Sequence, residues 1–225
     1  TLLDIRRQRQ MCIRDRCYSA MMHQYRRESQ KVLELTDRVI QLSSDQGFVF
    51  WLAQANFLRG WALVEQEQAA EGIAAMHQGS ADWRATGTEF LVAYTKALLA
   101  EANVRLGQAQ EGIDLLAEAF AVAQEKDQGL YEAELYRLKG EMLLKFGSPE
   151  TEVEAYFNQA IQVARKRNAK SQELRATTSL ARLLQKEGRA SEGQAILAKC
   201  YTWFTEGFKT NDMREAKELL EELAH

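Results

Sequence analysis

The fold is decided by the stretch Phe57-Leu-Arg-Gly60-Trp61-Ala-Leu63 and, after a polar break, by Glu71-Gly72-Ile73-Ala-Ala-Met76-His-Gln-Gly79. Each part has apolar residues at helical spacing, so the two parts predict a pair of helices joined by a turn. The small residue of the first part returns at steps of 40 or 41 residues, in the slot occupied by Ala20, Gly60, Ala100, Gly140 and Ala181. A fixed period of this length is typical of a repeat architecture.

Two further slots of the repeat are also rich in small residues. The first holds Val32, Gly72, Gly112, Val153 and Gly193, and the second holds Val39, Gly79, Ala119, Ala160 and Cys200. Glycine inside a helix costs about 1 kcal/mol relative to alanine, so it persists where a side chain would hold two helices apart. We therefore expect these slots to mark the closest approaches between helices, as packing positions and not as ligand contacts.

The period predicts an all-α fold, a right-handed α-solenoid of about five helix hairpins with a 40-residue repeat and a C-terminal capping helix. We expect the hairpins at about 18–42, 48–86, 90–126, 130–168 and 171–205, and the cap at 213–223. Gly47 is suited to the left-handed position at a helix end. Pro149 is suited to the start of a helix, where its missing N–H does no harm.

Composition excludes several classes of protein. The formal net charge is −3, which gives no general attraction to nucleic acid. No apolar run approaches the roughly 18 residues of a membrane helix, and no signal-peptide pattern opens the chain. Cys12, Cys17 and Cys200 have neither disulfide-framework nor metal-ligand spacing. These features predict a reduced, cytoplasmic setting.

Residues 1–16 do not share the repeat pattern. The string Met11-Cys-Ile-Arg-Asp-Arg16 resembles one reading frame of an adapter used in sequencing libraries. We therefore interpret residues 1–16 as a non-native or disordered leader and residues 17–225 as the repeat domain, with the native protein extending upstream. The alternative for the leader is a frayed basic helix.

The spacing of small residues resembles that of the tetratricopeptide repeat (TPR). Repeat two carries the pattern as Gly60-Trp61-Ala62-Leu63, Gly72 and Gly79, and repeat three as Ala100, Gly112 and Ala119. The TPR period is 34 residues, so each helix here is expected to be longer by most of a turn. HEAT and armadillo repeats have periods of about 40–47, but their small-residue pattern fits less well.

Several longer segments resemble the repeat tails of bacterial proteins that join a class III adenylate/guanylate cyclase to an AAA-like ATPase. The resemblance covers about Tyr18–Leu223 and is carried by Trp51-Leu-Ala-Gln-Ala, Leu58-Arg-Gly-Trp-Ala62, Tyr131-Glu-Ala-Glu-Leu-Tyr-Arg-Leu-Lys-Gly-Glu141, Ser179-Leu-Ala-Arg182 and Trp203-Phe-Thr-Glu-Gly-Phe208. It implies an interaction and effector-sensing module that regulates an upstream ATPase and cyclase region absent from this chain. The alternative is the effector-binding TPR-like domain of a LuxR-type, ATPase-containing transcriptional regulator.

The TPR resemblance also implies a partner-binding groove lined by the first helices. The implied lining residues are Phe57, Trp61, Glu65, Tyr94, Glu101, Arg105, Glu134, Arg137, Glu141, Lys145, Arg175, Arg182 and Lys186. The implied partner is a protein or peptide segment, with the upstream ATPase domain of the same polypeptide as one candidate, and neither nucleic acid nor membrane. The alternative is a solvated face whose charges pair with one another.

The residues suggest no catalytic, metal or cofactor site. No phosphate-binding loop occurs, and His23, His77 and His225 are not at metal-ligand spacings. His77 lies among apolar positions, which predicts a partly buried core histidine. We therefore expect a chain that is not an enzyme and that holds no cofactor.

Overall fold

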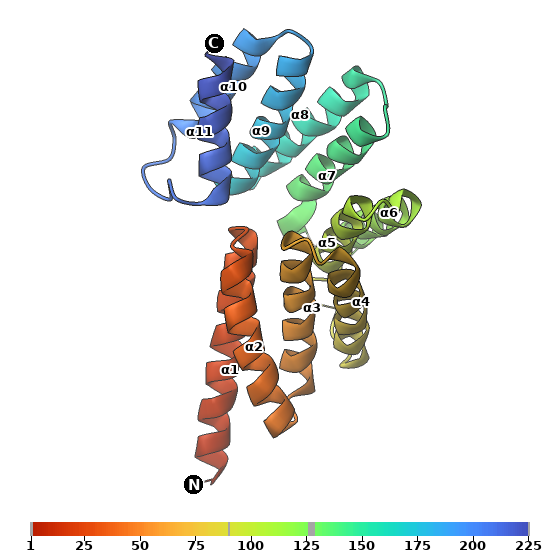
Figure 1. Cartoon of the computed structure of the whole chain (residues 1–225), viewed down its shortest axis with the longest axis vertical. Helices are drawn as coiled ribbons and strands as arrows, with labels where there is room; N and C mark the ends of the chain where they lie inside the picture. The colour runs from red at the N-terminus through yellow and green to blue at the C-terminus, as the bar shows by residue number, and fades with distance from the viewer. Residues whose placement is uncertain (1, 90, 126–128, 225) are drawn as a thin grey trace. The chain divides into compact units, whose positions relative to one another are not determined.

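The structure is a computed structural model that describes residues 2–89, 91–125 and 129–224, with side chains described from Gln10 onward. Within these ranges every regular element is a helix (Figure 1). Successive helices pack on one another as hairpins, which confirms the predicted all-α, solenoid-type class. The predicted hairpin limits at Phe90 and Lys126 lie outside the described residues.

The chain divides into two compact units, and the first spans residues 1–112. From α1 to α5 each helix packs on the next, and the first helices of successive hairpins also contact each other, α1 on α3 and α3 on α5. Such stacking of hairpins covers a helix on more than one side. The helices are α1 (Leu2–Tyr25), α2 (Ser29–Gln46), α3 (Val49–Glu65), α4 (Ala69–Ala85), α5 (Val92–Arg105) and the start of α6 (Ala109–Glu125).

The second unit spans residues 113–225 and repeats this packing, with α7 against α9 and α9 against α11. Its last helix buries Met213, Ala216, Leu219 and Leu223 and exposes most of its charged residues, as predicted for a cap. After the rest of α6, its elements are the 3₁₀ turn η1 (Gly129–Tyr131) and helices α7 (Glu132–Lys145), α8 (Glu150–Lys166), α9 (Lys170–Lys186), α10 (Ala190–Tyr201) and α11 (Asn211–Leu223).

The small-residue slots are the closest approaches between helices, which confirms the packing prediction. A Cβ built on Gly60 would lie 2.6 Å from the carbonyl oxygen of Gly72, and one on Gly72 would lie 2.5 Å from the carbonyl oxygen of Gly60. On Gly79 it would lie 2.6 Å from the backbone nitrogen of Phe57. The alanines of the first slot, such as Ala100, are fully buried.

The predicted helix ends are confirmed at two turns. Gly47 has φ 69° and its N–H donates to the carbonyl groups of Ser43 and Ser44, so it ends α2 in the left-handed conformation. Pro149 immediately precedes α8.

The first helix is longer than predicted, because α1 begins at Leu2 and not near Tyr18. Ile13 and Cys17 are buried on it and pack with Val39 and Ala55. The assignment of residues 1–16 as a leader foreign to the 17–225 repeat domain stays a prediction.

Candidate functional site

In the first unit, three of the predicted groove residues form one ion-pair cluster. The two Nη atoms of Arg105 on α5 lie 2.5 Å from Oε1 of Glu65 on α3 and 2.9 Å from Oε1 of Glu101. Glu65 and Arg105 occupy the same slot of consecutive repeats, so the pair joins equivalent helices. Burial raises the pKa of Glu65, and the nearby charge of Arg105 does not cancel this increase.

The aromatic residues predicted for the groove are core residues instead, so this part of the prediction was wrong. Phe57, Trp61 and Tyr94 are 0%, 3% and 2% exposed. The Tyr94 hydroxyl donates to Oε1 of Gln24 at 2.7 Å, and its ring packs edge-on against Tyr25. The physical reason is that the small slots let the helices approach closely enough to enclose these rings between them.

In the second unit, the predicted charged residues form a chain of ion pairs that begins on α7. Arg137 Nη2 lies 2.6 Å from Oε1 of Glu134, and its Nη1 lies 3.3 Å from Oε1 of Glu141. Ser179 on α9 donates its hydroxyl to Glu141 at 2.6 Å, which carries the chain to the next first helix. Glu134 is only 3% exposed and therefore does not line a surface, contrary to the prediction.

The chain continues from α9 to the capping helix through Arg175. Its Nε lies 2.8 Å from Oδ2 of Asp212, and its Nη1 lies 4.0 Å from Oε1 of Glu134. The Arg175 side chain is 13% exposed. Burial alone would lower the pKa of its guanidinium, but Asp212 and Glu134 raise it, and the net shift is upward. Arg175 is therefore a buried structural cation and not a free anchor for a partner.

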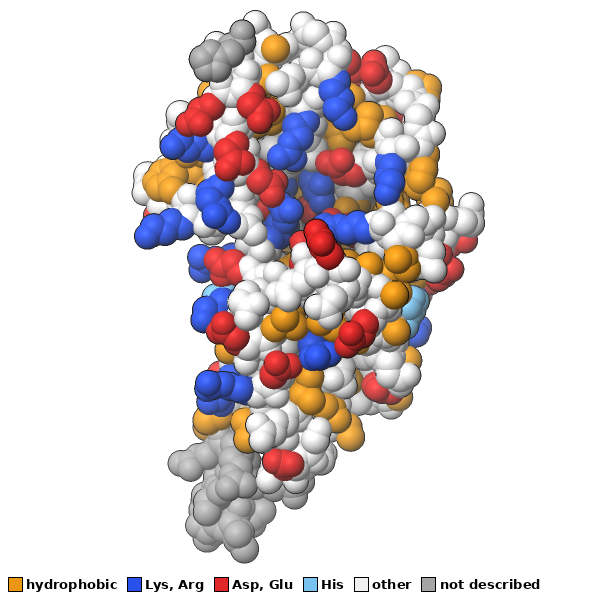
Figure 2. Space-filling model, viewed as in Figure 1, with side chains coloured by type: hydrophobic (Ala, Val, Ile, Leu, Met, Phe, Trp, Pro, Cys, Tyr) orange, Lys and Arg blue, Asp and Glu red, His pale blue; other side chains and the backbone are white. Residues whose placement is uncertain are grey.

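Three predicted basic residues of this unit remain exposed: Lys145, Arg182 and Lys186. Arg182 makes one long contact, with Nη2 3.4 Å from Oε2 of Glu215. Figure 2 shows basic and acidic side chains interleaved on the surface. Most of the predicted charges are thus paired internally, as in the alternative interpretation, and these three residues are the exposed basic residues of the set in this unit.

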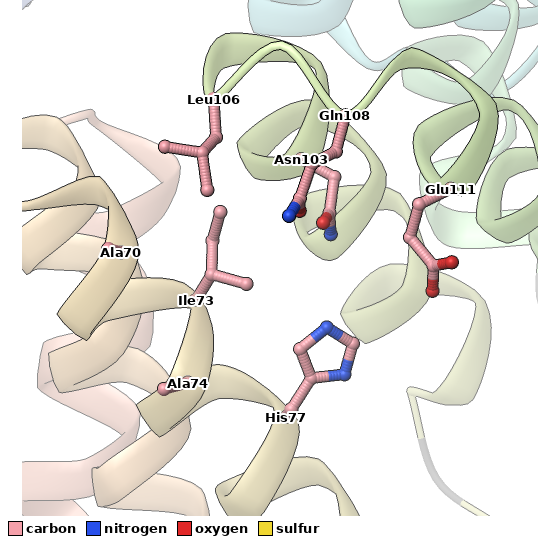
Figure 3. A pocket seen from close by; sticks show the side chains of 8 residues that line it. All are labelled: Ala70, Ile73, Ala74, His77, Asn103, Leu106, Gln108 and Glu111. Carbon is pink, nitrogen blue, oxygen red and sulfur yellow. The ribbon is translucent and has the colours of Figure 1, made fainter.

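The first unit also contains a separate hollow that the sequence pattern does not predict (Figure 3). It has a volume of about 580 Å³ and is formed by α4, the end of α5 and the start of α6. His77 lines it and is exposed, so the prediction of a core histidine was wrong. Its apolar neighbour Met76, which suggested burial, faces Gly60 on α3 instead. The lining residues are Ala70, Ile73, Ala74, His77, Asn103, Leu106, Gln108 and Glu111.

Metal sites, membrane-spanning helices and reactive thiols were the remaining features to consider in the described part of the chain. No three His, Cys, Asp or Glu residues come together there as a metal site, and no helix there is both long and apolar enough to cross a membrane. Burial raises the pKa of the Cys17 thiol to about 12 and also raises that of Cys200. Neither thiol is therefore activated for nucleophilic attack.

Comparison with known proteins supports the fold. No family model matches the sequence, and a search of curated proteins gives no match. Among solved structures, the chain is similar to TPR-like repeats of a Podosopora anserina protein named after kinesin light chain. A single-substitution form gives a TM-score of 0.57 and another form gives 0.55, each at 18% identity over 84% of this chain and 93% of that chain. The chain therefore has a TPR-like repeat fold.

Proposed function

We propose that this chain is a protein-interaction module that binds a protein or peptide segment on its first helices. The observation that carries the proposal is the TPR-like stack in which Lys145, Arg182 and Lys186 stay exposed beside a chain of internal ion pairs. Repeat stacks bind partners along faces built from equivalent helices. Arginine is enriched among the side chains that dominate binding energy, so Arg182 is the leading candidate.

We further propose that the module senses an effector or partner and regulates an upstream ATPase and nucleotide-cyclase region of a bacterial signalling protein. Support comes from the segments quoted above, among them Trp51-Leu-Ala-Gln-Ala and Ser179-Leu-Ala-Arg182. Binding would favour one of two states of the ATPase, which requires different affinities for the two states. In this proposal the module itself is not an enzyme, acts in the cytoplasm, and contacts neither nucleic acid nor membrane.

The test begins with recovery of the complete open reading frame. ATP hydrolysis and cyclase activity are then measured in the full-length protein and in an Arg182→Glu, Lys186→Glu double variant. The matched control is Lys199→Glu, which reverses an exposed charge on the second helix α10. We expect the double variant to change either activity or its response to the effector, and the control to behave as the wild type.

Two results would contradict the proposal. Equal behaviour of the double variant and the wild type would remove the role of the exposed cations. A reading frame without an ATPase or cyclase would overturn the signalling assignment, and a DNA-binding helix-turn-helix beside an ATPase would favour a transcriptional regulator instead.

A further inference from the structure

The hollow between α4, α5 and α6 is lined by both apolar and polar residues, of which Ile73 and Asn103 are buried and the others are exposed. Ile73 and Leu106 supply the largest apolar side chains, and Ala70 and Ala74 leave space beside them. In Figure 3 the amide ends of Asn103 and Gln108 extend to the same side of the hollow, while the His77 ring points toward them from α4. A volume of about 580 Å³ lies within the range of small-ligand sites, about 300–1,000 Å³.

The lining contains acceptors that the described part of the chain does not satisfy. Asn103 is 1% exposed and donates its Nδ2 to the carbonyl of Leu99 at 2.8 Å, but its Oδ1 accepts no hydrogen bond from described residues. The Glu111 carboxylate forms no ion pair with them either. Because an acceptor without a donor costs free energy in a poorly solvated place, the amide of Asn103 favours a donor placed in the hollow.

The hollow is lined by one acidic residue, Glu111, and neither lysine nor arginine is among its lining residues. A ligand with a cationic end and an aliphatic stem satisfies both the carboxylate and the apolar lining residues. Long basic side chains have this form, since their stems pack on apolar surface while the charged end reaches a polar group.

We propose that the hollow binds an arginine side chain from a peptide segment of a partner protein. The guanidinium pairs with Glu111 and donates to Oδ1 of Asn103, the stem lies over Ile73 and Leu106, and the exposed amide of Gln108 bonds the peptide backbone. Arginine is favoured over lysine because its planar fork matches a carboxylate with two parallel hydrogen bonds. This inference rests on the proposed function as an interaction module, and it names the partner chemistry at a surface that does not include Lys145, Arg182 or Lys186.

The test is a nuclear magnetic resonance titration of the full chain with two matched tripeptide amides. One is acetyl-Ala-Arg-Ala-amide, and the other replaces arginine with citrulline, which keeps the shape and removes the charge. The reporters are the His77 ring protons and the Leu106 methyl groups. We expect saturable shifts at both reporters with the arginine peptide and at least tenfold weaker binding of the citrulline peptide.

Two variants assign the charge preference to one carboxylate. Glu111→Gln should lower the affinity for the arginine peptide to that for the citrulline peptide. Glu152→Gln should leave it unchanged, because Glu152 is exposed in the equivalent slot of the next repeat. Both residues are exposed, and dispersed amide spectra will show that each variant is folded.

The proposal is overturned if neither reporter shifts, if both peptides bind equally, or if Glu111→Gln binds as the wild type does. These outcomes are independent of the ATPase test, since the tripeptides probe only this hollow. A normal response of the full-length protein together with a silent hollow would reject the arginine site and leave the proposed function standing.

Discussion

Replacing Gly72 with alanine is expected to destabilise the first unit although alanine is the better helix former. The added Cβ would lie 2.5 Å from the carbonyl oxygen of Gly60, 2.7 Å from Cγ2 of Val64 and 2.8 Å from its backbone nitrogen. Two of these three atoms belong to the backbone of α3, so no side-chain rotation removes the clash. The helices α3 and α4 must move apart.

The size of the effect follows from two opposing terms. Alanine gains about 1 kcal/mol over glycine within a helix. Forcing a methyl group into a packed interface costs about 1–3 kcal/mol, and contacts with backbone atoms place this case at the upper end. We therefore expect the Gly72→Ala variant to lose about 2 kcal/mol of local stability.

Hydrogen–deuterium exchange read by mass spectrometry measures this loss helix by helix, which suits a repeat chain whose unfolding need not be two-state. Peptides from α3 and α4 should exchange about thirtyfold faster in the Gly72→Ala variant, the factor that corresponds to about 2 kcal/mol.

The control is Gly193→Ala, in the same slot of the last repeat. Its Cβ would lie 3.0 Å from the carbonyl oxygen of Ala181 and 3.5 Å from Cβ of Leu184, so a small adjustment suffices. The helix-propensity gain then roughly offsets the strain, and α9 and α10 should exchange within about 0.5 kcal/mol of the wild type. Unchanged or slower exchange in Gly72→Ala would refute the packing argument, as would an equal loss in both variants.

Three further outcomes follow from buried groups. Arg175→Met should lower the stability of α9 and α11 by about 3–5 kcal/mol in exchange experiments, because it leaves Asp212 buried without its cation. The double variant Arg175→Met with Asp212→Asn should recover part of this loss. Equal exchange in the single variant and the wild type would contradict the prediction. Burial alone would raise the pKa of Glu173, but hydrogen bonds from Arg165 and Lys170 lower it overall. Its stabilisation is therefore complete above its ordinary value of 4.5 and is lost as the pH falls below it. Urea unfolding of Glu173→Gln should show a flatter decline there, and an unchanged acid limb would count against the pairing. A thiol reagent at pH 8 should label exposed Cys12 at once and leave Cys17 protected until unfolding, since Cys17 is buried and its pKa is raised to about 12; equal rates would argue against this.

The repeat and its packing slots could be predicted from sequence because a glycine within a helix is easily recognised in the sequence. Gly60 and Gly72 interrupt helices that are otherwise rich in good helix formers, and the interruption recurs with the period. A glycine inside a helix indicates close packing whichever helix is the neighbour. These packing positions can therefore be predicted without knowing which helices are in contact.

The groove could be predicted only in part, because the direction of a side chain around a helix depends on its neighbours. The TPR register assigns Phe57 and Trp61 to a surface, but close approach of α3 and α4 encloses them. The apolar neighbours of His77 predict that it is buried, but it is exposed, because Met76 faces α3 from a different side of α4. The hollow around Glu111 draws residues from three elements, and no spacing signals such a set.

The two kinds of repeated slot do different work in this chain. Small slots such as Gly60 and Gly72 bring helices of one hairpin together, whereas charged slots such as Glu65 and Arg105 join equivalent helices of consecutive hairpins across 40 residues. A charge committed to this second task is already satisfied and gains little from a partner. Partner recognition therefore falls to charges that take no part in these links between first helices. Two examples of opposite sign are the exposed cation Arg182, whose contact with Glu215 is long, and the carboxylate of Glu111.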